Sequence, residues 1–268
     1  MTGKPPRVLA VAGSDSCGSA GIQADIKTIT MLGGYAMTAV TAVTAQNTVG
    51  VQAVEALPAE IVGQQIDSCL NDIGADAIKI GMLHDVEVVA EVAASLGQIG
   101  KAVPIILDPV MVATSGAKLI DDEAVGAMKE ALFPLATLIT PNLPELEMLS
   151  AQQCGTTEEM ADAALALASK YGCNVLAKGG HASGDRIVDA LVGPDTRAMS
   201  FNHARIATRH THGTGCTLSS AIATLMGHGQ PLEHAVRLAR KFVFQAIEGA
   251  PGYGTGNGPL GHQAVRDL

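Results

Sequence analysis

Short apolar runs alternate with longer amphipathic stretches along the whole chain, and this alternation restricts the fold more than any other feature. The runs end in Gly, Asp or Pro, and several are apolar at consecutive positions, as expected for strands buried on both faces. A repeated strand and helix order is typical of a mostly parallel sheet with helices on both faces. The predicted strands are 8–12, 36–45, 77–80, 104–107, 137–140 and 174–177.

The segments between these strands carry helix signals and one departure from parallel order. Residues 156–159 form a capping-box pattern that opens an Ala-rich helix to about residue 171. Two short alternating segments within 185–208 predict a small antiparallel hairpin added to the sheet. Because no internal repeat or linker is found, we predict a single α/β domain over residues 1–268. Further helix starts are predicted at Pro58, Asp121 and Pro231.

Composition excludes several classes of partner. The net charge is -9, from 17 Lys and Arg against 26 Asp and Glu, and only 3% of residues are aromatic, which argues against nucleic-acid binding. A membrane span needs about 18 consecutive apolar residues, and the sequence contains no such run. The apolar run in 4–12 is too short for a signal peptide. The five scattered cysteines fit a reducing compartment. We expect a soluble cytoplasmic protein with no nucleic-acid or membrane partner.

Three glycine-rich stretches are candidates for phosphate binding. The spacing in 256–261 resembles a dinucleotide fingerprint, but no strand precedes it and Pro259 interrupts it. The stretch 13–20 follows a strand but lacks the Lys of a P-loop, so a substrate-facing loop and a plain turn remain equal alternatives. The stretch 211–217 leads into an apolar helix predicted at 218–226, where backbone N–H groups and the helix dipole favour an anion. It is the best candidate, although a simple turn into a buried helix is the alternative.

Cys216 belongs to that third stretch. A thiol in the first turn of a helix has a lowered pKa, so Cys216 is a candidate for a partly ionised base or a polar contact at the reacting centre. The alternative is a small buried apolar residue. A zinc site made with His210 and His212 is disfavoured, because no further ligand pair with metal spacing accompanies them.

Polar residues follow several predicted strands at the carboxyl edge of the sheet, where ligands bind in open α/β folds. Asp108 ends one strand, and Asn142 and Glu145 follow the next. Their oxygens suit a magnesium ion completed by phosphate, although helix capping is an equal alternative. Lys178 ends another strand beside two glycines, where it either contacts a transferred phosphoryl group or lies in solvent.

Two further polar residues stand in apolar surroundings. Gln46 follows the second strand and can both donate to and accept from the edge of an aminopyrimidine ring. Asp25 lies in the first predicted helix. Spacing alone leaves a loop or surface position open for both.

Seven segments in order resemble the hydroxymethylpyrimidine and phosphomethylpyrimidine kinases of thiamine biosynthesis, in the ribokinase superfamily. The similarity extends from about residue 8 to the tail. It implies a ribokinase-like α/β fold, usually dimeric. The implied reaction moves the γ-phosphoryl group of ATP, with Mg²⁺, onto 4-amino-5-hydroxymethyl-2-methylpyrimidine and then onto the resulting monophosphate. The segments are AGSDSCGSAGIQADIKT (12–28), TAQNTVGV (44–51), KIGML (79–83), LDPVMVATSG (107–116), TPNLPELEML (140–149), LAKGGH (176–181) and THGTGCTLSSAIA (211–223).

The resemblance also implies residue roles. An anion hole is implied at 213–215, a metal site near Asp108 and Glu145, and a mobile flap at 112–118. Nucleotide contacts are expected from Lys178, Lys241 and Asn142. The catalytic set is then Cys216 with Gly213, Thr214 and Gly215, and the implied pyrimidine site contains Gly13, Ala20, Asp25, Gln46, Met82, Val110 and Cys216.

One departure from the wider superfamily concerns Cys216, since most sugar kinases have an aspartate base there. We hypothesise that Cys216 in place of a carboxylate reduces repulsion of the phosphorylated second acceptor, which is already anionic and needs no base. The alternative functions are a pyridoxine or pyridoxal kinase of the same superfamily and a non-catalytic pyrimidine-binding protein. The presence of Asp108, Glu145 and Lys178 together argues against the latter.

Overall fold

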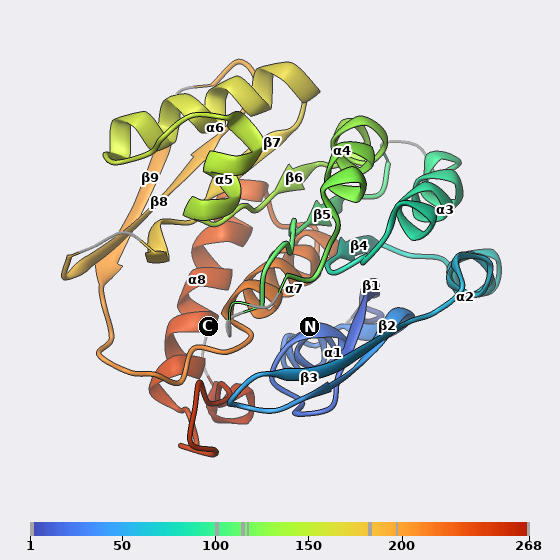
Figure 1. Ribbon diagram of the computed structural model, residues 1–268, viewed down its shortest axis with the longest axis horizontal. Helices are drawn as coiled ribbons and strands as arrows, with labels where there is room; N and C mark the ends of the chain where they lie inside the picture. The colour runs from blue at the N-terminus through green and yellow to red at the C-terminus, as the bar shows by residue number, and fades with distance from the viewer. Residues whose placement is uncertain are drawn as a thin grey trace.

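A nine-stranded sheet forms the centre of the computed structural model, which describes residues 3–99, 102–113, 116, 118–181, 184–196 and 198–266 (Figure 1). Its order is β3-β2-β1-β4-β5-β6-β7-β8-β9. Strands β2, β1, β4, β5, β6 and β7 are parallel. Strand β3 extends one end of the sheet, and β8 and β9 extend the other end, by antiparallel pairing. The strands are β1 (Arg7–Asp15), β2 (Tyr35–Gln46), β3 (Val51–Ala56), β4 (Ala77–Ile80), β5 (Ile105–Leu107), β6 (Leu138–Ile139), β7 (Asn174–Ala177), β8 (Arg186–Val192) and β9 (Met199–Ala204).

Helices cover both faces of this sheet (Figure 1). One apolar core lies between the sheet and α2 to α6, and a second lies between the sheet and α1, α7 and α8. The helices are α1 (Gly21–Met31), α2 (Ala59–Asp72), α3 (Val86–Gly97), α4 (Asp122–Ala131), α5 (Leu143–Ser150), α6 (Thr157–Tyr171), α7 (Thr214–Gly227) and α8 (Leu232–Glu248), with 3₁₀ turns η1 (Phe133–Leu135), η2 (Gly179–His181) and η3 (His262–Ala264).

The central strand β1 shows why its apolar residues are consecutive. Leu9 and Val11 point into the core with α2 and α3, whereas Val8 and Ala10 point into the core with α1 and α7. Side chains alternate along a strand, so a strand covered on both faces needs apolar residues at every position. All six predicted strands are confirmed, and so is the antiparallel hairpin, which forms β8 and β9.

Two boundaries and one strand differ from the sequence expectations. Strand β1 continues to Asp15, with an irregularity in pairing after Ala12. Strand β3 was not predicted, because this edge strand exposes Gln52 and Glu55 and lacks a continuous apolar run. Helix α7 begins at Thr214, so part of the predicted glycine loop is its first turn.

Two further expectations concern the flap and membrane spans. The flap predicted at 112–118 lies partly outside the described residues, since 114, 115 and 117 are not among them, and it stays a prediction. Within the described chain, no helix combines the length and the apolar character needed to cross a membrane.

Candidate active site

The carboxyl ends of the parallel strands meet at one edge of the sheet, and a cavity of about 800 Å³ opens there. We call it the sheet-edge cavity. It is lined by strand-end residues that include Asp15, Gln46, Asp108 and Lys178, and by the first turn of α7. Parallel strands therefore bring together side chains that are more than a hundred residues apart in the sequence.

Asp108 and Lys178 form the charged centre of this cavity. Lys178 Nζ donates to Asp108 Oδ1 at 2.7 Å, and the Thr140 hydroxyl donates to the same oxygen at 2.9 Å. Burial opposes the charge on Lys178, but Asp108 and Glu145 outweigh it and raise the pKa of the ammonium group. The pair therefore keeps a cation at the strand ends while Asp108 Oδ2 remains outside these two bonds.

Glu145 and Asn142 lie at the start of α5, at the edge of the cavity. The Glu145 carboxylate accepts from Asn142 N at 2.8 Å, and Asn142 Oδ1 accepts from Glu145 N at 3.0 Å, which is a capping box. Helix capping, the alternative raised from the sequence, is thus present, yet both residues also line the cavity. The pKa of Glu145 is raised to about 7. Burial is the largest cause and Asp108 adds to it, while Lys178 opposes the shift only in part.

The first turn of α7 brings backbone amides to this centre. Gly213, the N-cap, has a φ of +89°, and a Cβ there would lie 1.8 Å from the carbonyl oxygen of Ser19. At Gly215, a Cβ would lie 3.0 Å from Asp108 Oδ2 and 3.4 Å from Lys178 Nζ. The amides of a first turn have no partner within their helix, and this turn lines the cavity, so its amides are candidate donors for an anion. Thr214 N also donates to the Thr211 carbonyl oxygen at 3.3 Å.

Cys216 follows in the same turn, but the expected lowering of its pKa is wrong. Burial is the largest effect and raises the pKa of the thiol to about 11, with Asp25 and Asp108 adding to it and Lys79 opposing it. The cost of burying a thiolate exceeds the effect of the helix dipole. Cys216 is therefore a neutral thiol at physiological pH.

Asp15 is a functional candidate that the sequence analysis did not identify, and it lies near His212, which the sequence analysis considered only as a zinc ligand. Gln46 Nε2 lies 2.9 Å from His212 Nε2, and Asp15 Oδ2 lies 3.5 Å from the same ring nitrogen. Burial opposes ionisation of Asp15, but His212 and the backbone amides of Ala20, Cys17 and Ser19 outweigh it and lower its pKa. The available signal was position, because Asp15 ends a strand and His212 directly precedes the glycine turn.

Most of the predicted site residues lie together in the sheet-edge cavity, with two exceptions. Asp25 is fully buried and does not line it, and Lys241 is exposed on α8 and does not line it. No group of three or more His, Cys, Asp or Glu residues placed to hold a metal is found in the described part of the chain, which gives the zinc alternative no support. The predicted residues that line the cavity are Gly13, Ala20, Gln46, Met82, Asp108, Val110, Asn142, Glu145, Lys178, Gly213, Thr214, Gly215 and Cys216.

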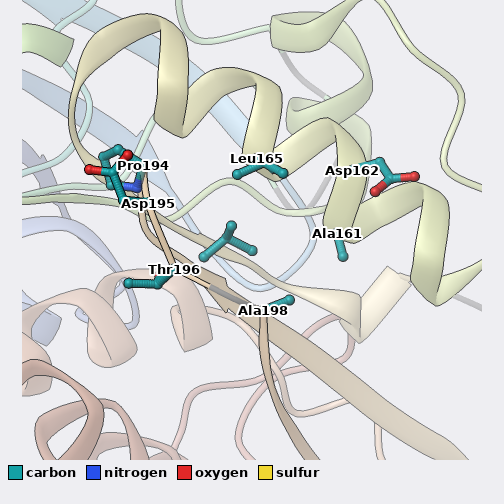
Figure 2. Close-up of a pocket in the computed structure, with 8 residues that line it drawn as sticks. Ala161, Asp162, Leu165, Pro194, Asp195, Thr196 and Ala198 are labelled. Carbon is teal, nitrogen blue, oxygen red and sulfur yellow. The ribbon is translucent and has the colours of Figure 1, made fainter.

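A second hollow of about 460 Å³ lies between α6 and the turn that joins β8 to β9 (Figure 2). Figure 2 shows Asp162 and Leu165 on the helix and Pro194, Asp195 and Thr196 on the turn. It brings together none of the residues selected from the sequence, so the sheet-edge cavity is the better candidate for the functional site.

Comparison with known proteins identifies the family. Residues 15–261 match the family described as phosphomethylpyrimidine kinase. The chain belongs to this family. It is 42% identical over 260 residues to the hydroxymethylpyrimidine/phosphomethylpyrimidine kinase of Bacillus subtilis, covering 97% of this chain and 96% of that protein. It is 46% identical over 265 residues to the thiamine biosynthesis bifunctional protein ThiED of Geobacter sulfurreducens, covering 97% of this chain but only 54% of that protein, about half its length.

A solved structure supports the fold. The ADP complex of Bacillus subtilis pyridoxal kinase aligns with a TM-score of 0.88 at 32% identity, covering 97% of this chain and 98% of that one. The predicted ribokinase-like fold and the predicted kinase family are thereby confirmed.

Proposed function

We propose that this chain uses ATP to phosphorylate 4-amino-5-hydroxymethyl-2-methylpyrimidine to its monophosphate and then to its diphosphate. The observation that carries the proposal is the contact geometry at Gly215, where the first turn of α7 lies against Asp108 and Lys178 in one cavity. Phosphoryl transfer depends mainly on positioning and on stabilisation of charge, and this geometry supplies both.

The two ends of the cavity differ in the way that two substrates require. On one side, Gln46 offers an amide beside the apolar side chains of Met82 and Val110, which suits an aminopyrimidine ring. On the other side, β8 and α8 contribute the apolar residues Ile187 and Val243 together with Asp189, and the apolar part suits the base of a nucleotide. The γ-phosphoryl group would then lie between them, at the charged centre.

The residues of the site also fit Mg²⁺. Mg²⁺ binds to one or two protein carboxylates and completes its octahedron with water and phosphate oxygens, so Asp108 and Glu145 suffice without a third ligand. When bound, the ion would neutralise charge on the phosphoryl oxygens. Asp108 and Glu145 would hold it, while Lys178 and the first turn of α7 bind the transferred group.

Glu145→Gln should therefore raise the Mg²⁺ concentration needed for half-maximal turnover about tenfold, because the variant loses a charged ligand but keeps an oxygen that can accept from Asn142 N. Turnover is measured across a Mg²⁺ titration. Glu159→Gln is the matched control, since Glu159 forms the same capping box with Thr156 at the start of α6, outside the cavity. Equal Mg²⁺ dependence in both variants would contradict the assignment of Glu145.

Mass spectrometry of the products tests the reaction directly. Incubation of the aminopyrimidine alcohol with ATP and Mg²⁺ should yield the monophosphate first and the diphosphate later. Absence of any phosphorylated pyrimidine would refute the proposal.

The likeness to a pyridoxal kinase favours a second candidate activity, phosphorylation of pyridoxal or pyridoxine. Both activities would use the same anion site and charged centre. They would differ in the ring of the acceptor that the cavity binds. A higher kcat/KM for pyridoxal than for the aminopyrimidine alcohol in the same assay would make this the main activity.

Cys216 should act as a neutral contact and not as a base, because its thiol pKa is about 11. Cys216→Ser should keep the shape of the pH-rate profile between about pH 6 and about pH 9, whatever its effect on the absolute rate. A profile measured at saturating substrates checks this. Loss of a pH-dependent limb in the variant would show that the thiolate takes part.

A homodimer, a single domain over 1–268 and a cytoplasmic location remain part of the proposal. The family resemblance supports the first, the lack of an internal repeat or linker in the sequence supports the second, and the five scattered cysteines support the third. Light scattering coupled to size exclusion tests the first, and limited proteolysis tests the second. Fractionation of cells that express the chain tests the third.

A further inference from the structure

A lysine is completely buried beneath the sheet-edge cavity. Lys79 lies in β4 between Ile78 and Ile80, and its side chain has 0% exposure. Strand alternation puts it on the same face as Ala77, the face covered by α1 and α7. An ammonium group is almost never fully buried without a partner, because removing the charge from water is costly.

The partners of Lys79 connect three elements. Its Nζ donates to Asp25 Oδ2 of α1 at 2.9 Å, and the other carboxylate oxygen, Asp25 Oδ1, accepts from the Ser220 hydroxyl of α7 at 2.6 Å. All three residues are 0% exposed. Ser220 lies one helical turn after Cys216, so the network joins β4 and α1 to the beginning of α7.

The network lies close to the charged centre without lining the cavity. Burial opposes the charge on Lys79, but the carboxylates of Asp25 and Asp108 outweigh it and raise its pKa. The ammonium group is also tightly enclosed, since a Cβ at Gly81 would lie 2.7 Å from Lys79 Nζ. Its position is therefore fixed from several sides at once.

The energetics indicate a geometric role. A buried ion pair adds little net stability compared with well-packed apolar residues, because desolvation offsets the attraction. The ion pair adds a directional link to α7. This link matters because the first turn of α7, the proposed anion site, must lie against Asp108 and Lys178. Misplacement by about 1 Å in such a site can cost about a hundredfold in rate.

We propose that Lys79, Asp25 and Ser220 form a positioning network that fixes the first turn of α7 against Asp108 and Lys178. This inference rests on the proposed function for its kinetic consequence. It also gives Asp25, which the sequence assigned to the substrate site, a different role one layer below that site.

Ser220→Ala tests the link to α7. It should lower kcat about tenfold while the KM values of both substrates change by less than about threefold, because the ground-state contacts remain and the alignment for transfer does not. Thr224→Val is the matched control, since it also removes a buried hydroxyl from α7, but one that bonds only to Ser220 O of the same helix. The control should show a similar fall in Tm and a kcat within about twofold of wild type.

A double variant separates charge from stability. Lys79→Met alone leaves the Asp25 carboxylate buried without its cation and is expected to fold poorly. Lys79→Met combined with Asp25→Asn removes both charges and keeps an oxygen for Ser220. Its Tm should be near that of wild type, yet its kcat should fall.

Hydrogen exchange over residues 211–218 gives a readout that does not depend on the substrate. Exchange should be faster in Ser220→Ala than in Thr224→Val. If wild type does not phosphorylate the aminopyrimidine, the proposed function fails while the exchange result still tests the network. If wild type is active but Ser220→Ala matches the control in kcat and exchange, the network proposal is overturned.

Discussion

Gly213→Ala should lower kcat/KM for phosphoryl transfer at least about a hundredfold. The backbone at Gly213 has a φ of +89°, a conformation that L-residues rarely adopt, and the added Cβ would lie 1.8 Å from the carbonyl oxygen of Ser19. Since that neighbour is backbone, either the loop at 15–20 or the first turn of α7 must move. Both line the sheet-edge cavity, so the displacement reaches the anion site directly.

Steady-state kinetics and thermal unfolding of the same preparation check this prediction. Gly126→Ala in α4 is the control, because a Cβ there meets nothing within 4 Å and alanine is favoured in a helix interior by about 0.5–1 kcal/mol. The control should keep full activity and unfold at an equal or slightly higher temperature. A Gly213→Ala variant with nearly wild-type kcat/KM would show that the first turn of α7 does not need its present position.

Local sequence signals predicted the sheet and much of the site for clear physical reasons. Consecutive apolar residues such as Val8 and Leu9 require burial on both faces of a strand, and parallel strands then bring their polar end residues to one edge. Asp108 and Lys178 follow β5 and β7, which flank β6, so both reach the same edge, although their contact at 2.7 Å was not predicted. Capping boxes are equally local, which explains the correct start of α6.

Features that depend on tertiary burial were not predictable in the same way. A thiol at an exposed helix N-terminus has a lowered pKa. The surrounding elements remove water from the Cys216 thiol, and this burial raises its pKa instead. The pairing of Lys79 with Asp25 joins residues 54 positions apart, and no periodicity indicates it. The assignment of Asp25 to the ring site came from resemblance, whereas its location one layer deeper required coordinates.

Cys216→Asp should reduce the second phosphorylation at least about tenfold more than the first. Asp25 and Asp108 already oppose negative charge at this position, as their effect on the thiol pKa shows. A carboxylate there would also repel an acceptor that is itself a phosphate. Two like charges about 4 Å apart interact by about 4 kcal/mol at an effective dielectric constant of about 20, more than enough for this difference.

The first acceptor is a neutral alcohol, so the same carboxylate brings no comparable repulsion and adds a base that can take the hydroxyl proton. The ratio of the two rates is therefore the informative quantity, and it is measured by following the monophosphate and the diphosphate separately. Cys216→Asn, with similar size and no charge, should change both steps by a similar factor. If Cys216→Asp also changes both steps equally, the neutral thiol is not what permits the second transfer, and shape alone would account for a cysteine at the head of α7.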